Sequence, residues 1–118
     1  MKKLLAVVAL LVFALGALTL VSCSSEQDEA VVGTWNLEGL DSYRYVFNED
    51  GTGSRGGGIF EVETFRWSTS GDRLNINRDE AARGEIRNER WTYSISGNTL
   101  TIDSQQESGL VFRLSRAD

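Results

Sequence analysis

The stretch FRWSTSGDRLNI, residues Phe65 to Ile76, decides the fold class of this chain. Apolar residues alternate with polar ones on both sides of a turn that starts at Ser70. Such alternation places the apolar side chains on one face of a β-strand, and glycine beside aspartate tolerates the positive φ of a tight hairpin turn. The stretch therefore predicts an antiparallel hairpin with one buried face.

A second stretch, WTYSISGNTLTI, repeats this design 26 residues later, from Trp91 to Ile102. Five of the twelve aligned positions are identical: Ser68 and Ser94, Ser70 and Ser96, Gly71 and Gly97, Leu74 and Leu100, Ile76 and Ile102. Either one structural unit is used twice, or two turns with the same conformational demands have converged on the same residues. Both interpretations predict a second hairpin of the same kind.

Alternating patterns also cover the rest of the chain from Val31 to Arg116, whereas a helix-like pattern is confined to Asp79–Arg83, before Gly84. Seven or eight short strands joined by tight turns are typical of an antiparallel barrel or sandwich. A closed barrel also removes the exposed strand edges that promote aggregation. We therefore expect an all-β domain.

Aromatic residues dominate the predicted inner face. The nine that fall there are Trp35, Tyr43, Tyr45, Phe47, Phe65, Trp67, Trp91, Tyr93 and Phe112. An eight-stranded barrel has an interior just wide enough for side chains or one small ligand. The aromatic set therefore predicts either a filled core or an aromatic-lined pocket near one mouth, with Tyr45, Trp67, Trp91 and Tyr93 as the candidate ligand-binding residues.

The N-terminal residues have the features of an export signal, with Lys2 and Lys3 before an apolar run from Leu4 to Leu20. The sequence Leu-Val-Ser-Cys that ends at Cys23 resembles the lipobox of bacterial lipoproteins. This resemblance implies cleavage before Cys23 and a thioether from its sulfur to diacylglycerol. The alternative is an unpaired cysteine behind an ordinary signal or membrane anchor, since a single cysteine excludes a disulfide within the chain.

Removal of residues 1–22 would leave 96 residues with ten arginines, 17 acidic residues and a formal charge of −7. That length suits one small domain, and that charge argues against nucleic acid as a partner. Residues 23–30 are polar and acidic, and we expect a disordered tether there. By resemblance to lipoproteins, the protein is expected in the cell envelope. It would lie on the periplasmic face of the outer membrane in a cell with two membranes, because Ser24 follows the cysteine, and on the outer face of the plasma membrane otherwise.

The chain is poorly supplied for catalysis, because it contains no histidine and its one cysteine is assigned to lipid. Ser/His and Cys/His nucleophiles and the usual zinc ligand sets are therefore missing. Glu61 and Glu63 are spaced to share one strand face, which favours solvent-facing carboxylates opposite an inward Val62 over an acid–base pair. We expect no enzyme, no catalytic residue, no metal and no cofactor.

Two further segments have patterns that bear on function: a glycine-rich one and a charged one. Residues Gly51–Gly56 match G-x-G-x-x-G, but no helix pattern follows, so we interpret them as a flexible hairpin loop able to gate a barrel mouth. The segment Asn77–Arg90 carries four arginines and four acidic residues. We expect a solvated loop or hairpin tip there, and it is the best candidate for an arginine-centred contact with an envelope protein.

Residues 31–116 resemble the small bacterial lipocalin-like domains that often follow lipoprotein signals. The matching residues are Gly33-Thr34-Trp35, Tyr45 to Gly53, Phe65-Arg66-Trp67, Ser70-Gly71-Asp72, and Ser96 to Leu100 with Ile102. The resemblance implies an antiparallel up-and-down barrel in which Trp35 plugs one end and an arginine of the last strand stacks on it. Arg116 has the required facing parity and Arg113 does not, and the contact would contribute about 0.5–2 kcal/mol.

Two functional hypotheses follow. The first is a lipid-anchored, lipocalin-like barrel that binds a small apolar or amphipathic molecule at the cell envelope. The alternative is an anchored barrel with a filled core that binds or inhibits another envelope protein. An enclosed void lined by Trp67, Trp91 or Tyr93 would favour the first, and a solid interior with a coherent exposed patch would favour the second.

Overall fold

A computed structural model describes residues 26–117 of the chain. The expected signal segment 1–22 and the expected lipidation site Cys23 lie outside the described residues. The strands are β2 (Gly33–Leu37), β3 (Arg44–Phe47), β4 (Thr52–Gly57), β5 (Phe60–Ser70), β6 (Arg73–Arg78), β7 (Asn88–Ser96), β8 (Thr99–Ser104) and β9 (Val111–Arg116). Within this part of the chain no helix is present, and so none that could cross a membrane.

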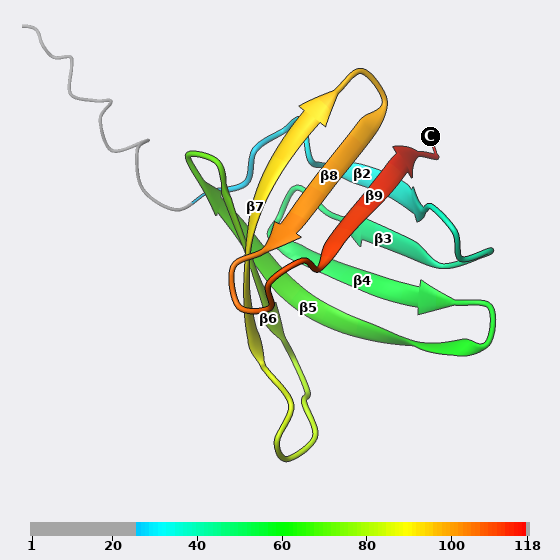
Figure 1. The fold of residues 1–118 in the computed structure, drawn as a ribbon, viewed down its shortest axis with the longest axis vertical. Coiled ribbons are helices and arrows are strands. Elements are labelled where there is room, and N and C mark those ends of the chain that lie inside the picture. Colours follow the sequence, from blue (N-terminus) through cyan, green and yellow to red (C-terminus); the bar gives the residue numbers. More distant parts are fainter. Residues whose placement is uncertain (1–25, 118) are drawn as a thin grey trace, which may run out of the picture.

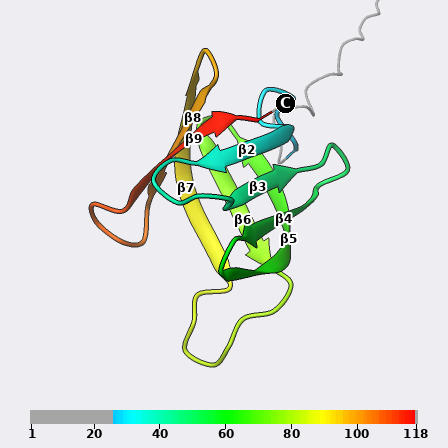
Figure 2. The same cartoon turned by 90° about the vertical axis from the view of Figure 1, so that its right-hand side faces the viewer.

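The eight strands form one closed antiparallel barrel in which each strand pairs with its neighbour in sequence (Figures 1 and 2). Pairing of β2 with β9 closes it, with Trp35 opposite Arg116. The predicted all-β, up-and-down barrel is therefore confirmed.

The two repeated stretches form the hairpins β5–β6 and β7–β8. Each hairpin has a two-residue turn, and the first turn residues, Gly71 and Gly97, adopt φ values of 61° and 59°. Glycine is the residue that adopts this conformation without a steric penalty. The leucine and isoleucine shared by the two copies are fully buried, as alternation after the turn requires.

The barrel interior is filled by aromatic and aliphatic side chains. The buried set is Val31, Trp35, Tyr45, Phe47, Phe65, Trp67, Leu74, Ile76, Trp91, Leu100, Ile102 and Leu114, while Tyr43, Tyr93 and Phe112 pack against it half-buried. Phe47 lies at the centre of an aromatic array, with ring centroids 5.9 Å from Tyr45, 5.6 Å from Phe65 and 5.1 Å from Trp67. Such contacts leave the interior occupied by the protein's own rings.

The G-x-G-x-x-G segment is strand β4 rather than the flexible, gating loop that we expected. Gly53 pairs with Phe47 on one side and Phe65 on the other. A Cβ at Gly53 would overlap the Phe65 ring and the Val46 carbonyl oxygen. The glycine is therefore a packing requirement, because the ring of Phe65 covers the backbone of β4.

The start of β5 also differs from our expectation. Val62 is 65% exposed, whereas Glu63 lies on the inner side with Phe65 and bonds an interior arginine. A β-bulge sets Glu61 and Val62 together opposite Gly56, so Glu61 and Glu63 do not share one regular strand face. The expected solvent-facing carboxylate pair with an inward Val62 is therefore wrong.

Residues 26–30, which we expected within the disordered tether, are docked on the barrel. Glu26 forms an antiparallel bridge with Thr69, and the Gln27 side chain donates to the Trp67 carbonyl oxygen at 3.0 Å. The Asp28 carboxylate accepts a 2.6 Å hydrogen bond from the Tyr93 hydroxyl. These partners lie at least 40 residues away in the sequence, so only the folded barrel assembles them.

Candidate functional site

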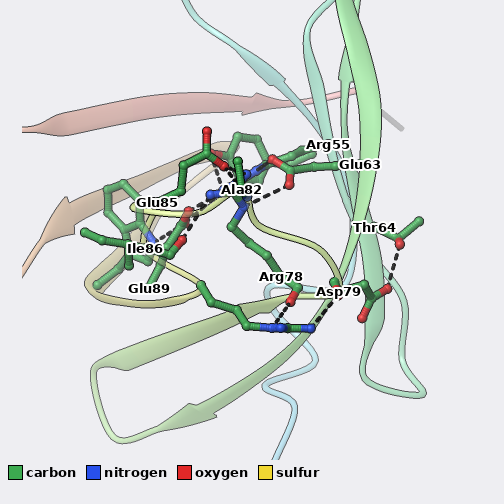
Figure 3. Close-up of polar contacts among 12 residues, drawn as sticks. Arg55, Glu63, Thr64, Arg78, Asp79, Ala82, Glu85, Ile86 and Glu89 are labelled. Atoms are coloured by element: carbon green, nitrogen blue, oxygen red, sulfur yellow. Dashed lines mark hydrogen bonds and ion pairs between the residues drawn. The ribbon is translucent and has the colours of Figure 1, made fainter.

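A buried arginine organises one end of the barrel. Arg55 of β4 is only 7% exposed, and its guanidinium binds the Glu89 carboxylate through two hydrogen bonds of 2.8 and 2.7 Å (Figure 3). Its Nε donates to Glu63 at 2.9 Å, and Nη1 lies 3.4 Å from the Tyr45 hydroxyl. This bidentate geometry is the strong form of an arginine–carboxylate pair, and it satisfies a charge that would be costly to bury alone.

The network continues outward through Arg78, at the end of β6. Arg78 Nε donates to the second oxygen of Glu63 at 2.9 Å, and Nη2 reaches Glu85 at 3.1 Å. Glu63 therefore bridges two guanidinium groups, one inside the barrel and one at its rim (Figure 3). We call Arg55, Glu63, Arg78, Glu85 and Glu89 the Arg55 cluster.

Burial and the ion pairs shift the pKa values of Glu63 and Arg55 within the cluster. Burial raises the pKa of the Glu63 carboxyl, but hydrogen bonds from Arg78 and Arg55 outweigh burial and hold it below its ordinary value of 4.5. Burial lowers the pKa of the Arg55 guanidinium, but the bonds and charge of Glu89 raise it above its ordinary range. Burial raises the pKa of the Tyr45 hydroxyl. Glu63 and Arg55 are therefore both charged at neutral pH.

The structure does not bring the four predicted ligand-binding residues into one pocket. Tyr45 and Trp91 join the Arg55 cluster, because the Trp91 indole donates to Glu89 at 3.1 Å. The Trp67 indole donates to the carbonyl oxygens of Asn48 and Thr52, at 3.0 and 3.1 Å. The polar ends of these side chains are thus bonded inside the protein.

The fourth candidate, Tyr93, is likewise engaged, at the opposite end of the barrel from the Arg55 cluster. Its hydroxyl donates to Asp28, and burial together with this hydrogen bond raises the Tyr93 pKa to about 12. The same end holds Trp35, whose indole donates to the Val31 carbonyl oxygen at 2.8 Å and whose ring lies beneath the guanidinium of Arg116. Arg116 also donates to the carbonyl oxygens of Val32 and Ala30.

An open groove of about 580 Å³ lies outside the Arg55 cluster, between the start of β5 and the β6–β7 loop, residues 79–87. Its walls are formed by Glu61, Val62, Glu63, Thr64, Arg78, Asp79, Glu80, Ala81, Ala82 and Glu85. Apolar Val62, Ala81 and Ala82 therefore lie among five carboxylates and one guanidinium. Beside it, at the tip of the β4–β5 hairpin, Ile59 is 92% exposed.

The predicted interaction segment 77–90 supplies one wall of this groove. Two of its four arginines hold the loop itself: Arg78 Nη1 donates to the Ile86 carbonyl oxygen at 3.0 Å, and Arg87 Nε donates to the Arg78 carbonyl oxygen at 3.0 Å. Glu85 also accepts from the Ala82 amide at 3.0 Å, so the loop is internally braced. Acidic side chains rather than arginines dominate the wall.

Sequence reasoning missed Arg55 and Glu89, although alternation carried a signal for each. Arg55 is in phase with buried Gly53, and Glu89 is in phase with buried Trp91. Treating the glycines around Arg55 as a loop removes the strand phase that predicts an inward arginine.

The family described as "Family of unknown function (DUF5640)" matches residues 29–115, which span the barrel. No curated protein and no solved structure matches the chain. In residues 26–117 no group of three histidine, cysteine, aspartate or glutamate side chains is placed to hold a metal ion.

Proposed function

The chain belongs to the DUF5640 family, and we propose that it is a lipid-anchored cell-envelope protein whose barrel binds another protein. Binding uses the groove between β5 and the β6–β7 loop, and Cys23 carries the lipid. The observation that carries this proposal is the contrast between the two sides of the barrel wall. The interior rings pack on one another with their polar atoms bonded, whereas apolar and acidic side chains are exposed together at the groove.

The small-ligand alternative needs free interior volume and free polar groups. Tyr45, Trp67 and Trp91 are at most 4% exposed, and each directs its polar atom to a protein partner. A ligand among these rings would have to displace packed aromatic contacts and leave buried donors unpaired. Binding of a protein at the rim would leave both the aromatic packing and the buried hydrogen bonds intact.

The charge of the groove indicates the kind of partner. Among the described residues, no side chain bonds the carboxylates of Glu61 or Glu80, so both face solvent unneutralised. An acidic wall with small apolar patches complements a basic surface that also carries apolar side chains. The exposed Ile59 and Val62 supply the apolar contact that interface cores need.

Site-specific photocrosslinking in cells tests the proposal. A benzophenone amino acid at position Ile59 or Glu80 should crosslink the full-length protein to one discrete partner. The same probe at position Arg113 is the matched control, because Arg113 is exposed on β9, four strands around the barrel from β5. Equal crosslinking from all three positions would contradict a specific surface.

A second measurement separates the two functional hypotheses. Tryptophan fluorescence should stay unchanged during titration with fatty acids and lysophospholipids, because Trp35, Trp67 and Trp91 are buried and their indole N–H groups are already bonded within the protein. A saturable change that Trp67→Phe abolishes would favour the small-ligand hypothesis instead.

A further inference from the structure

Strand β5 is longer than the strand beside it. It runs for 11 residues from Phe60, whereas β6 has 6, and their ladder ends where Phe65 pairs with Arg78. One further contact follows, from the Asp79 amide to the Thr64 carbonyl oxygen at 3.1 Å, reinforced by the Thr64 hydroxyl on the Asp79 carboxylate at 2.6 Å (Figure 3). After Asp79 the β6–β7 loop turns away from β5, so the loop and the first residues of β5 diverge (Figure 1).

Residues Phe60–Glu63 are therefore paired on one side only. They face β4 through the pairs Arg55–Glu63 and Gly57–Phe60, and in residues 26–117 no strand pairs with them on the opposite side. Backbone groups alternate in direction along a strand, and the Thr64 carbonyl oxygen points toward Asp79. Alternation is interrupted at the β-bulge formed by Glu61 and Val62, and the side of Glu61–Glu63 that does not pair with β4 borders the groove.

This open edge has side walls that suit a bound strand. Val62 projects outward from the edge, and Ala81 and Ala82 line the facing loop. Glu61 and Glu80 add negative charge on both sides of the groove. The loop is braced by Arg78 and Glu85, so little order is lost when a partner binds.

We propose that the partner adds a β-strand to the edge at Phe60–Glu63, and that this strand is an extended basic segment of another protein. The inference rests on the proposed function and specifies how the groove is used. Main-chain hydrogen bonds to the unpaired side of Phe60–Glu63 would supply affinity, as in other cases of strand addition. Alternating apolar and basic side chains would then meet Val62 and the carboxylates on either side.

The charges argue against a second copy of this chain as the occupant. Pairing two Phe60–Glu63 edges would place the acidic residues of one copy among those of the other, and like charges on neighbouring strands destabilise a sheet. Acidic side chains on an edge strand are also a common means of preventing self-association. A basic segment would instead bring positive side chains next to these acidic residues, so the charges would attract.

A peptide titration tests the strand. The probe is a fluorescein-labelled octapeptide of alternating lysine and valine, added to the full-length protein in detergent and followed by anisotropy. The matched control peptide replaces one central valine with proline, which keeps the charge but removes a backbone donor and disfavours a paired strand. We expect the proline peptide to bind about tenfold more weakly.

Charge-reversed proteins test the walls of the groove. The variant Glu61→Lys/Glu80→Lys should lose about tenfold or more in affinity for the lysine–valine peptide and should bind a glutamate–valine peptide instead. Glu38→Lys/Glu49→Lys makes the same charge change at two exposed residues outside the groove and should retain affinity. Neither pair of side chains makes a hydrogen bond or ion pair to a described residue, so all four substitutions should preserve the fold.

Four results would overturn the inference. Equal binding of the proline peptide would mean attraction without strand addition. No binding of the lysine–valine peptide, with crosslinks still formed from positions 59 and 80, would remove this inference and leave the proposed function standing. A dimer seen by sedimentation, which the peptide dissociates, would make a second copy the occupant. Loss of both peptide binding and crosslinks would remove the proposed function as well.

Discussion

The guanidinium carbon of Arg116 lies 4.1 Å from the ring centroid of Trp35, and the two residues are register partners where the last strand joins the first. The stacked pair therefore covers the junction that closes the barrel. Arg116 also binds two carbonyl oxygens of the segment before β2, at 3.2 and 2.9 Å. The Arg116 side chain thus links the last strand of the domain to the segment that precedes its first strand.

Arg116→Ala should lower the free energy of unfolding by about 1–3 kcal/mol, because it removes the cation–π contact and two hydrogen bonds. Urea denaturation followed by tryptophan fluorescence measures this change. Arg113→Ala, an exposed position on the same strand, is the control and should stay within about 0.5 kcal/mol of the parent. Equal effects of the two substitutions would contradict a clamping role for Arg116.

Glu89→Leu should lower the free energy of unfolding by about 3 kcal/mol, because it leaves the Arg55 guanidinium buried with only part of its partners. In the double variant Arg55→Met/Glu89→Leu neither charge of the pair remains to be left uncompensated. Its loss should therefore be smaller than the sum of the two single losses, by about 1 kcal/mol or more. Additive losses would mean that the pair is not coupled.

Stability should fall in acid through Glu63. The folded-state pKa of Glu63 lies below its ordinary value of 4.5, so its contribution is present above that pH and is lost as the pH falls through the lower folded value. Denaturation midpoints measured between neutral pH and about pH 3 should drop less steeply in Glu63→Gln. Glu61→Gln, at an exposed carboxylate two residues away, should follow the parent profile.

Gly53→Ala should destabilise the barrel by about 1–3 kcal/mol, because the added methyl overlaps the Phe65 ring and the Val46 carbonyl oxygen. Gly97→Asn is the comparison. A Cβ at Gly97 meets no atom within 4 Å, and asparagine tolerates the positive φ of that turn. Thermal denaturation should therefore show the larger loss for Gly53→Ala.

Cys23→Ala should abolish incorporation of labelled palmitate and leave an unprocessed precursor in cells. Gel mobility and autoradiography of the full-length protein measure both effects. Ser25→Ala, beside the expected lipidation site, should be processed and labelled as the parent is. Labelling that survives Cys23→Ala would refute the lipid anchor.

Local patterns in the sequence were sufficient to predict an all-β domain of short antiparallel strands, and the resemblance to lipocalin-like domains favoured a barrel over a sandwich. The alternation of Phe65 and Trp67, and of Leu74 and Ile76 beyond Gly71, states which residues are buried before any partner strand is known. It does so because side-chain direction in a strand depends only on position along that strand. The hairpin turns were predictable for the same reason, since positive φ at Gly71 and Gly97 is a local property.

The Arg55 cluster, the docking of Asp28 on Tyr93 and the open edge at Phe60–Glu63 emerged only when the strands were assembled. Each depends on the relation between segments: Arg55 and Glu89 are 34 residues apart, and the edge exists because β6 ends at Arg78, opposite Phe65, while β5 begins at Phe60. Register and bulges set these relations, and one inserted residue opposite Gly56 separates Glu61 from the inner face that Glu63 shares with Phe65. Alternation along one strand contains no information about where its neighbour stops, so the open edge was visible only in the folded chain.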